Sequence, residues 1–245
     1  MTLLLLAAAL EVAGPVSLSV RTYGADVEVA PGPRLSVSVS GRPDVRPSIR
    51  ALGGNRYEAE FDGKRQLHEG ALRVEVPAGS AIDVSTVLGR VSIAGVGGPA
   101  RVRGMSGAVR VAGGAEVDVE TVDGGIEVDD ASGKVRIHTT SGVSAVSATA
   151  LGEIELETAS GAASFRGACG ARCRIDVDSV SGEVHFALAP GSAFSASLIT
   201  TSGHVRDTLG LSLHGREAWT EGRFHGGDGA IECETFSGDI VFGAR

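Results

Sequence analysis

Apolar and polar residues alternate along most of this chain, in short runs bounded by glycine. After Gly124, for example, Ile126 and Val128 are apolar and the residue between them, Glu127, is charged. Alternation with a period of two is typical of β-strands that bury one face. Helical periodicity is not found after the first ten residues. The pattern therefore predicts an all-β protein.

A four-residue corner, Thr/Ser-x-x-Gly, separates these strands and returns about every 18 residues. Its copies are Thr86–Gly89, Thr121–Gly124, Thr139–Gly142, Thr158–Gly161, Ser179–Gly182, Thr200–Gly203 and Thr235–Gly238, and Gly104–Gly107 is a copy without the leading hydroxyl. Fixed periods of this length are typical of repeat proteins whose units contact only their neighbours. We therefore expect a single β-solenoid, similar to a β-helix or β-roll, with coils of about 18 residues.

The corner predicts its own local chemistry. The glycines, such as Gly124 and Gly182, are expected at positive φ, where other residues are strained. The residue before the glycine is usually serine, and we expect its hydroxyl to bond the amides of its own turn. Because no histidine accompanies these serines at a constant spacing, they are interpreted as structural and not as nucleophiles.

A second alternating strand lies between successive corners, and its outward residue forms a row along the coils. The row contains Asp83, Arg101, Asp118, Arg136, Glu155 and Asp176. Its first five members alternate in sign, and opposite charges on neighbouring strands contribute about 0.2–1 kcal/mol per pair. We interpret the row as a solvated face that fixes the register of the coils.

The start of the chain differs from the repeats. Residues 1–13 are predicted to be a signal peptide or a disordered start, because Met1–Leu10 resembles the apolar core of a secretory signal. This segment is too short to cross a bilayer, and we expect no transmembrane segment elsewhere. Residues 14–80 alternate irregularly and contain several prolines. We expect them to form an N-terminal β-strand cap, because an uncovered first coil would expose unpaired backbone.

The solenoid repeats are predicted to occupy residues 81–245, with an insertion at 207–228. This insertion contains the only tryptophan, Trp219. Loops on a rigid scaffold often carry binding residues, so Trp219 is the candidate for partner binding. A second interpretation is that this ring fills the core, as large aromatic rings usually do.

Composition restricts the classes of partner and chemistry. A formal net charge of −8 excludes nucleic acid and anionic membranes as main partners, because both require a basic face. Cys169 and Cys173 flank a short turn and could pair in an oxidising compartment, but we favour reduced, space-filling residues for these and Cys233. No spacing of cysteine or histidine suits a metal site. We therefore predict no metal, no cofactor and no catalytic residues.

One segment carries a family resemblance. The run from Leu72 to Val84, which contains Val74-Glu75-Val76-Pro77-Ala78-Gly79, is followed by repeated Thr-x-Ser-Gly coils. In this it resembles the bacterial β-strand-repeat domain often labelled "putative adhesin", a domain of unknown function. The resemblance covers roughly residues 15–245. It implies a β-solenoid and provides no catalytic residues.

Two functional hypotheses remain. The first is a non-enzymatic β-solenoid of the cell envelope or surface, periplasmic or secreted, that acts as an adhesin or interaction scaffold for an envelope protein or polysaccharide. The alternative is a carbohydrate-acting β-helix enzyme, a polysaccharide lyase or hydrolase. Its candidate residues would be Arg101, Asp118 and Arg136, with further carboxylates at Glu153, Glu155 and Glu157. The first is favoured, because such rows are ordinary exposed strand faces without an aromatic platform for sugar rings.

Overall fold

The computed structural model describes residues 6–40, 47–61, 70–210, 212–216, 219–224 and 227–244. Side chains are not described for Leu6, Ala7, Glu60, Phe61, Ala244 and the residues of 212–216 and 219–224. The regular elements of the described residues are all β-strands, which confirms the all-β prediction. In these residues no helix has the length and apolarity needed to cross a membrane. The chain divides into two compact units, residues 1–124 and 125–245.

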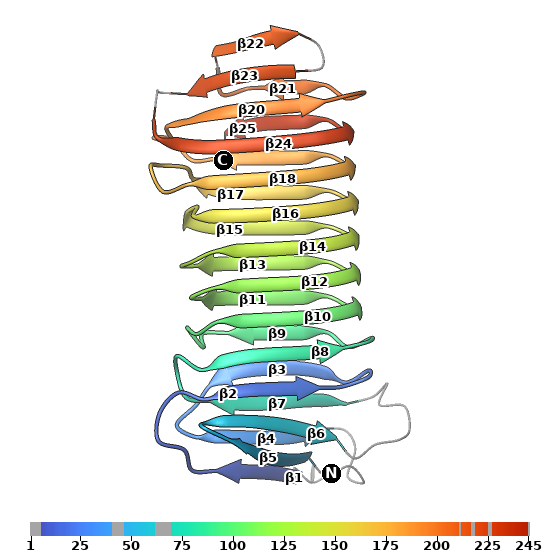
Figure 1. Ribbon diagram of the computed structural model, residues 1–245, viewed down its shortest axis with the longest axis vertical. Helices are drawn as coiled ribbons and strands as arrows, with labels where there is room; N and C mark the ends of the chain where they lie inside the picture. The colour runs from blue at the N-terminus through green and yellow to red at the C-terminus, as the bar shows by residue number, and fades with distance from the viewer. Residues whose placement is uncertain are drawn as a thin grey trace. The chain divides into compact units, whose positions relative to one another are not determined.

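Unit 1 contains the first twelve described strands. They are β1 (Leu6–Leu10), β2 (Ser17–Arg21), β3 (Asp26–Pro31), β4 (Leu35–Ser40), β5 (Pro47–Gly53), β6 (Arg56–Phe61), β7 (Ala71–Val76), β8 (Ala81–Thr86), β9 (Val91–Ala94), β10 (Ala100–Ser106), β11 (Val109–Gly114) and β12 (Val117–Asp123). They form two layers (Figure 1), one in the order β1-β4-β7-β3-β9-β11 and the other in the order β5-β6-β2-β8-β10-β12.

The strand order of unit 1 is not the order of the sequence. β2 lies between β6 and β8, and β3 lies between β7 and β9, all as parallel neighbours. β1, β4 and β5 add antiparallel ladders at the end of the unit. β1 covers part of the predicted signal segment, whose residues 1–5 lie outside the described chain. The predicted boundaries at residues 13 and 80 remain predictions.

Unit 2 contains thirteen strands among the described residues. They are β13 (Ile126–Ala131), β14 (Val135–Ser141), β15 (Ser144–Ala150), β16 (Glu153–Ser160), β17 (Ala163–Ala168), β18 (Arg174–Ser181), β19 (Val184–Leu188), β20 (Phe194–Thr200), β21 (Val205–Asp207), β22 (Ser212–Arg216), β23 (Trp219–Phe224), β24 (Gly229–Ser237) and β25 (Ile240–Ala244). One layer has the order β13-β15-β17-β19-β25-β21, and the other has β14-β16-β18-β24-β20-β23-β22.

The last strands of unit 2 also depart from sequence order. β24 pairs in parallel with β18 on one side and β20 on the other, and β25 lies in the same way between β19 and β21. The predicted insertion 207–228 contains the hairpin of β22 and β23, which adds to β20 in antiparallel fashion. The C-terminal coil is therefore placed between two coils that precede it in the chain.

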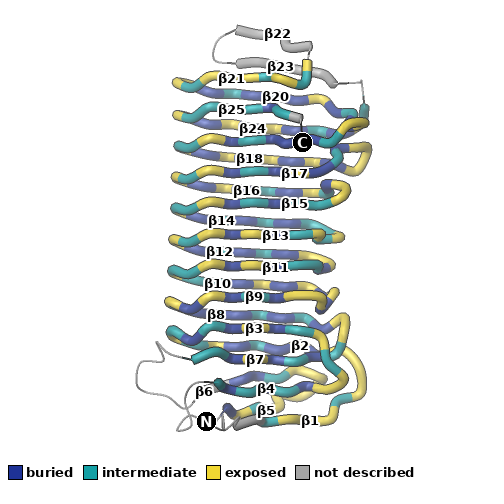
Figure 2. Tube along the Cα trace, turned by 180° about the vertical axis from the view of Figure 1, so that it is seen from behind, coloured by how far each residue is buried: buried dark blue, intermediate teal, exposed yellow. Residues whose placement is uncertain are grey.

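The core of each unit lies between its two layers and consists of the inward residues of alternating strands (Figure 2). Ile82 and Val84 of β8, for example, are at most 3% exposed, as are Val184 and Phe186 of β19. Ile126 and Val128, the pair predicted after Gly124, are likewise at most 2% exposed. This confirms the predicted register of inward and outward residues.

The corners agree with the sequence in five of the eight glycines and differ in the serines. Positive φ is found at Gly107, Gly124, Gly142, Gly161 and Gly182 but not at Gly89, Gly203 or Gly238. Gly124 and Gly182 have φ values of +140° and +128°, as predicted. In four of the corner serines, the hydroxyl does not bond the amides of its own turn. Instead, Ser181 Oγ donates to the Ala159 carbonyl of the neighbouring coil at 3.3 Å, and Ser160, Ser106 and Ser202 make equivalent bonds. Their side chains therefore tie neighbouring coils together, because stacking brings the next coil's carbonyl within reach.

The cysteine interpretation requires a correction. Cys169 and Cys173 form a disulfide across the turn between β17 and β18, whereas we favoured reduced thiols. The turn brings their Cα atoms to 5.1 Å, within the range that disulfides require. Cys233 is a free, buried thiol, and its burial raises its pKa to about 12. It fills space in the core, as expected for a buried cysteine.

Candidate functional site

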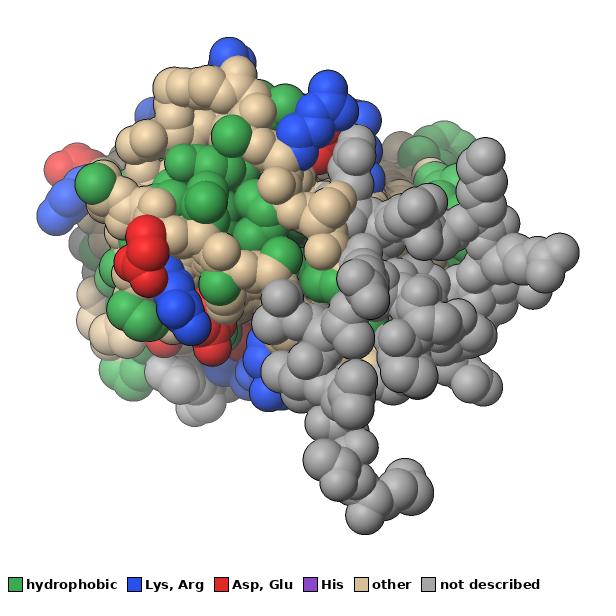
Figure 3. Space-filling model, turned by 90° about the horizontal axis from the view of Figure 1, so that it is seen from below, with side chains coloured by type: hydrophobic (Ala, Val, Ile, Leu, Met, Phe, Trp, Pro, Cys, Tyr) green, Lys and Arg blue, Asp and Glu red, His purple; other side chains and the backbone are tan. Residues whose placement is uncertain are grey.

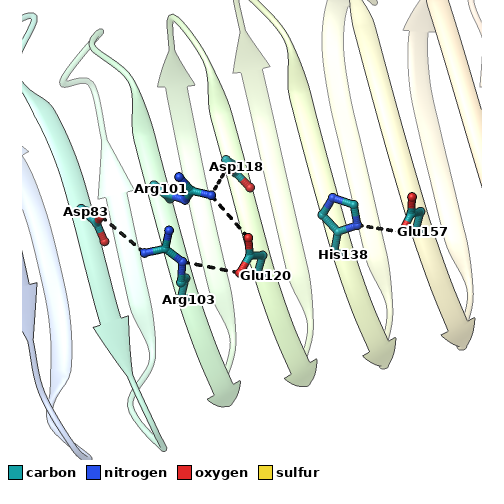
Figure 4. A network of polar contacts seen from close by, with 7 residues as sticks. All are labelled: Asp83, Arg101, Arg103, Asp118, Glu120, His138 and Glu157. Carbon is teal, nitrogen blue, oxygen red and sulfur yellow. Dashed lines mark hydrogen bonds and ion pairs between the residues drawn. The ribbon is translucent and has the colours of Figure 1, made fainter.

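The outer face of unit 1 carries a network of ion pairs at the predicted charge row (Figure 4). Arg101 Nη2 lies 3.1 Å from Asp118 Oδ2 and 3.5 Å from Glu120 Oε1. Arg103 joins Glu120 to Asp83, at 3.5 and 3.6 Å. Parallel pairing places Arg101 opposite both Asp83 and Asp118, as the predicted register requires. These pairs neutralise one another on an exposed sheet face.

The outer face of unit 2 starts with a similar arrangement. Lys134 Nζ lies 2.8 Å from Glu155 Oε2 and 3.0 Å from Glu153 Oε1. Hydrogen bonding to Glu155 is the main cause that raises the pKa of Lys134, and the same bond lowers the pKa of Glu155. His138 Nδ1 contacts Glu157 Oε2 at 3.0 Å (Figure 4). Lys134 is the nearest cation to Glu155. Because Lys134 lies outside the charge row predicted from the sequence, this contact was not expected.

Further along unit 2, two successive outward positions hold only carboxylates on three neighbouring strands. Six of them occupy in-register outward positions on three adjacent strands, namely Glu155, Glu157, Asp176, Asp178, Glu232 and Glu234. Partial burial is the main cause that raises the pKa of Asp176 and of Asp178, and neighbouring carboxylates raise both further. Like charges at directly opposite positions destabilise a sheet. The alternation of the row thus ends at β18.

This outer face does not gather its charged groups into a catalytic arrangement. Arg101 and Asp118 are bound to each other, and Glu153, Glu155 and Glu157 are bound to Lys134 or His138. Within the described part of the chain, no group of histidine, cysteine and carboxylate side chains could hold a metal ion. Acid–base chemistry needs groups that converge on a reacting atom, whereas these side chains stand side by side on a sheet.

Large apolar side chains are exposed at the corners of unit 1, which the sequence analysis missed. Tyr23, Leu88, Met105 and Val122 lie on four successive coils and are 58%, 43%, 58% and 48% exposed. The Tyr23 carbonyl accepts a hydrogen bond from the Leu88 amide, and Met105 and Val122 occupy adjacent positions between paired residues of β10 and β12. We call these four residues the corner row. The signal in the sequence was an apolar residue within the corner tetrapeptide or its equivalent.

Two further parts of the chain carry apolar residues that bear on partner binding. The predicted partner residue Trp219 lies on β23 opposite Ile199 of β20, but its side chain is outside the described residues. At the end of unit 1, where β1 and β5 form the sheet edges, apolar side chains gather, and a few charged side chains lie near them (Figure 3). Leu10 and Leu52 of these strands are 39% and 46% exposed.

Comparisons with known proteins concern the fold. Over nearly their whole lengths the chain is similar to three bacterial crystal structures. One is a "putative cell adhesion protein" from Clostridium sporogenes, with 11% identity and a TM-score of 0.34 over 100% of both chains. The second is a "putative adhesin" from Bacteroides fragilis, with 13% identity and a TM-score of 0.38 over 97% of this chain and 96% of that one. The third is a "putative adhesin" from Parabacteroides distasonis, with 10% identity and a TM-score of 0.37 over 98% and 97% of the two chains. The comparison with curated proteins gives no match.

A family model provides the assignment. The Toastrack DUF4097 model matches residues 59–206, more than half of the 245-residue chain. This span includes strands of both units, from β6 to β21. It also contains the strand motif and most of the corner repeats on which the resemblance was based. The chain therefore belongs to the Toastrack DUF4097 family.

Proposed function

We propose that this protein is a non-enzymatic interaction scaffold of the bacterial cell envelope or surface, and that it binds an envelope protein through the corner row of unit 1. The observation that carries the proposal is the exposure of Tyr23, Leu88, Met105 and Val122 on successive coils. Contiguous exposed apolar side chains on a soluble surface are typical of protein interaction sites. Because the coils hold them at fixed spacing, little ordering is needed on binding.

The location outside the cytoplasm is supported by the disulfide between Cys169 and Cys173. Disulfides persist in oxidising compartments and are rare where cellular thiols are kept reduced. A protein partner is favoured over a polysaccharide because the corner row is mainly aliphatic, with one aromatic ring, whereas sugar rings need flat aromatic platforms.

The proposal is tested by photo-crosslinking in the source cells. A photoreactive phenylalanine analogue replaces Met105 in one strain and Val180 in a control strain, since Val180 is equally exposed at 57% but lies on β18 of unit 2. We expect one discrete adduct from position 105 that is destroyed by protease and survives muramidase. An adduct removed by muramidase would indicate a cell-wall glycan. Absence of an adduct, or equal adducts from both positions, would contradict the proposal.

The enzymatic alternative has its own test. We expect the purified chain to release no product from an acidic polysaccharide such as polygalacturonate. Asp118 lies 3.1 Å from Arg101 on a neighbouring strand and is engaged in the ion-pair network. Cleavage that disappears in Asp118→Ala would overturn the non-enzymatic assignment.

A further inference from the structure

The segment that follows β19 forms one body within unit 2. We define the C-terminal body as residues 194–244, which contain β20 to β25. In the described chain, β20 pairs with β23 and β24, and β21 pairs with β25. The body joins the rest of unit 2 through two adjacent ladders, β18 with β24 and β19 with β25. The covalent link is the short segment 189–193. We call these two ladders the seam.

The outer side of the seam brings like charges together. Asp176 faces Glu232 and Asp178 faces Glu234, in register on parallel strands. On the other side of β18, Glu155 and Glu157 face the same two aspartates. On the β14 side, Lys134, Arg136 and His138 contact the β16 carboxylates.

Among the described side chains, the remaining outward neighbours of the seam are one cation, Arg174 of β18, and uncharged residues. Arg174 at the start of β18 pairs with Ala230, and Ser195 and Ser197 of β20 face Ala230 and Glu232. Among the described side chains, no cation therefore lies on the β24 side of these four carboxylates. Burial and the neighbouring carboxylates raise the pKa of Asp176 and Asp178. Repulsion across the seam is greatest where all of these groups are ionised.

The inner side of the seam is complementary. Ile175 faces Ile231, and Phe186 stacks on Phe242 with ring centroids 4.6 Å apart. Backbone hydrogen bonds also hold both ladders at their starts. The Ala230 amide donates to the Cys173 carbonyl in the β18–β24 ladder, and the Val184 amide donates to the Asp239 carbonyl in the β19–β25 ladder, each at 2.9 Å. An opened seam would expose two apolar, unpaired edges. A second copy of the chain offers the matching edge in the same register.

We propose that the C-terminal body detaches at the seam and docks on β18 and β19 of a second copy, so that two chains exchange these bodies and form a dimer. The link Ala189-Pro190-Gly191-Ser192-Ala193 acts as the hinge, and its five residues can extend over about 17 Å. Exchange of an identical element is a low-cost route to a dimer because it reuses contacts already made within one chain. The repulsion between the seam carboxylates controls when exchange occurs. Low pH protonates them and high salt screens them, so both should keep the seam closed. This proposal does not involve the corner row.

The test mixes two full-length variants, one with Ser181→Cys and the other with Ser237→Cys. These residues are direct partners across the seam, so a disulfide between different chains forms only after exchange. The control mixes Ser181→Cys with Ser160→Cys, which are partners across the β16–β18 ladder. Non-reducing electrophoresis measures the heterodimer, and mass spectrometry identifies the linked peptides.

At about pH 7.5 and low salt we expect the 181–237 heterodimer to exceed the 160–181 heterodimer about tenfold. Adding Asp178→Asn to the first chain and Glu234→Gln to the second should slow its formation roughly threefold to tenfold, as should salt of about 0.5 M. Equal amounts of the two heterodimers would overturn the proposal. So would an exchange rate that does not fall when the charges are removed.

Discussion

Phe242 stacks on Phe186, with ring planes within 16° of parallel, although the five strands β20 to β24 separate them along the chain. Phe186 also stacks on Phe165, so Phe242 continues an aromatic column inside unit 2. In a stack that followed sequence order, β21 would take this place and bring Asp207 to the position that Phe242 occupies. Burial of an aromatic ring is favourable, whereas burial of a charged carboxylate is costly. This difference explains the position of the C-terminal coil.

The first prediction tests this column. Phe242→Ala should lower the free energy of unfolding by about 3–5 kcal/mol, because a fully buried ring leaves a cavity. Chemical denaturation measures the change. The control is Phe236→Ala, which removes a ring that is 62% exposed and should change stability by less than about 0.5 kcal/mol. Equal effects of the two substitutions would show that Phe242 is not in the core.

The second prediction concerns the stacked corners. A Cβ atom at Gly182 would lie 2.0 Å from the Gly161 carbonyl oxygen, in addition to requiring a positive φ. Gly182→Ala should therefore destabilise by more than about 3 kcal/mol, as strain and a backbone clash combine. Gly191 has φ +89° with open space around its Cβ position, so Gly191→Ala should cost only the strain, about 1 kcal/mol. Thermal unfolding compares them, and the reverse order would contradict the stacked corner.

The third prediction measures one ion pair of the charge row. Arg101→Glu faces Asp118 with a like charge and should destabilise modestly, by less than about 1 kcal/mol. Exchanging the pair, as Arg101→Asp with Asp118→Arg, should recover part of the loss. A double-mutant cycle at low salt and at about 1 M salt measures the coupling, which should fall as salt screens it. A coupling of zero at low salt would show that the two residues do not interact.

The fourth prediction follows from the raised pKa of Asp176 and Asp178. Because the folded state binds these protons more tightly, protonation stabilises the fold. This contribution is present in full below the ordinary pKa of 3.8 and is lost as pH rises through the raised values. Asp176→Asn with Asp178→Asn should therefore raise the melting temperature at about pH 7 and have less effect near pH 4. A double variant that is less stable at neutral pH would contradict it.

The fifth prediction concerns the disulfide. It closes a short loop, and removing it by Cys169→Ala with Cys173→Ala should reduce stability by about 2 kcal/mol in the chain-entropy model. A reductant should destabilise the wild type and Cys233→Ala alike, without affecting the double alanine variant. Denaturant unfolding with and without dithiothreitol measures this difference. Reductant sensitivity that persists in the double variant would show that another thiol is responsible.

The sequence alone was sufficient for the repeating part of the fold. Ile82 and Val84 alternate with Asp83, and one slip of register would expose the whole apolar set, so local pattern determines which residues face inward. Gly182 is similarly predictable, because its backbone conformation excludes other residues. The bonds of Ser181 were less predictable, since its carbonyl partner on Ala159 belongs to a different coil.

The candidate site was predicted only in part. Arg101 and Asp118 were placed together correctly, because their spacing equals one coil. The corner row was missed, although an apolar residue such as Met105 within a polar corner was visible in the sequence. Whether such a residue forms a surface depends on how exposed its side chain is, and the alternation of apolar and polar residues does not show this for residues in turns. The contact of Lys134 with Glu155 was missed because it runs diagonally between coils.

Which coils are neighbours was decided by the tertiary structure. Every coil presents a similar alternating edge, so local sequence does not state whether β24 follows β18 or β20. Packing between distant segments makes that choice, since Phe242 completes the aromatic column and Asp207 does not. At the other end, the same freedom lets β2 enter between β6 and β8. A period-two pattern thus determines the face of each strand, and the long-range fit of side chains determines its place in the sheet.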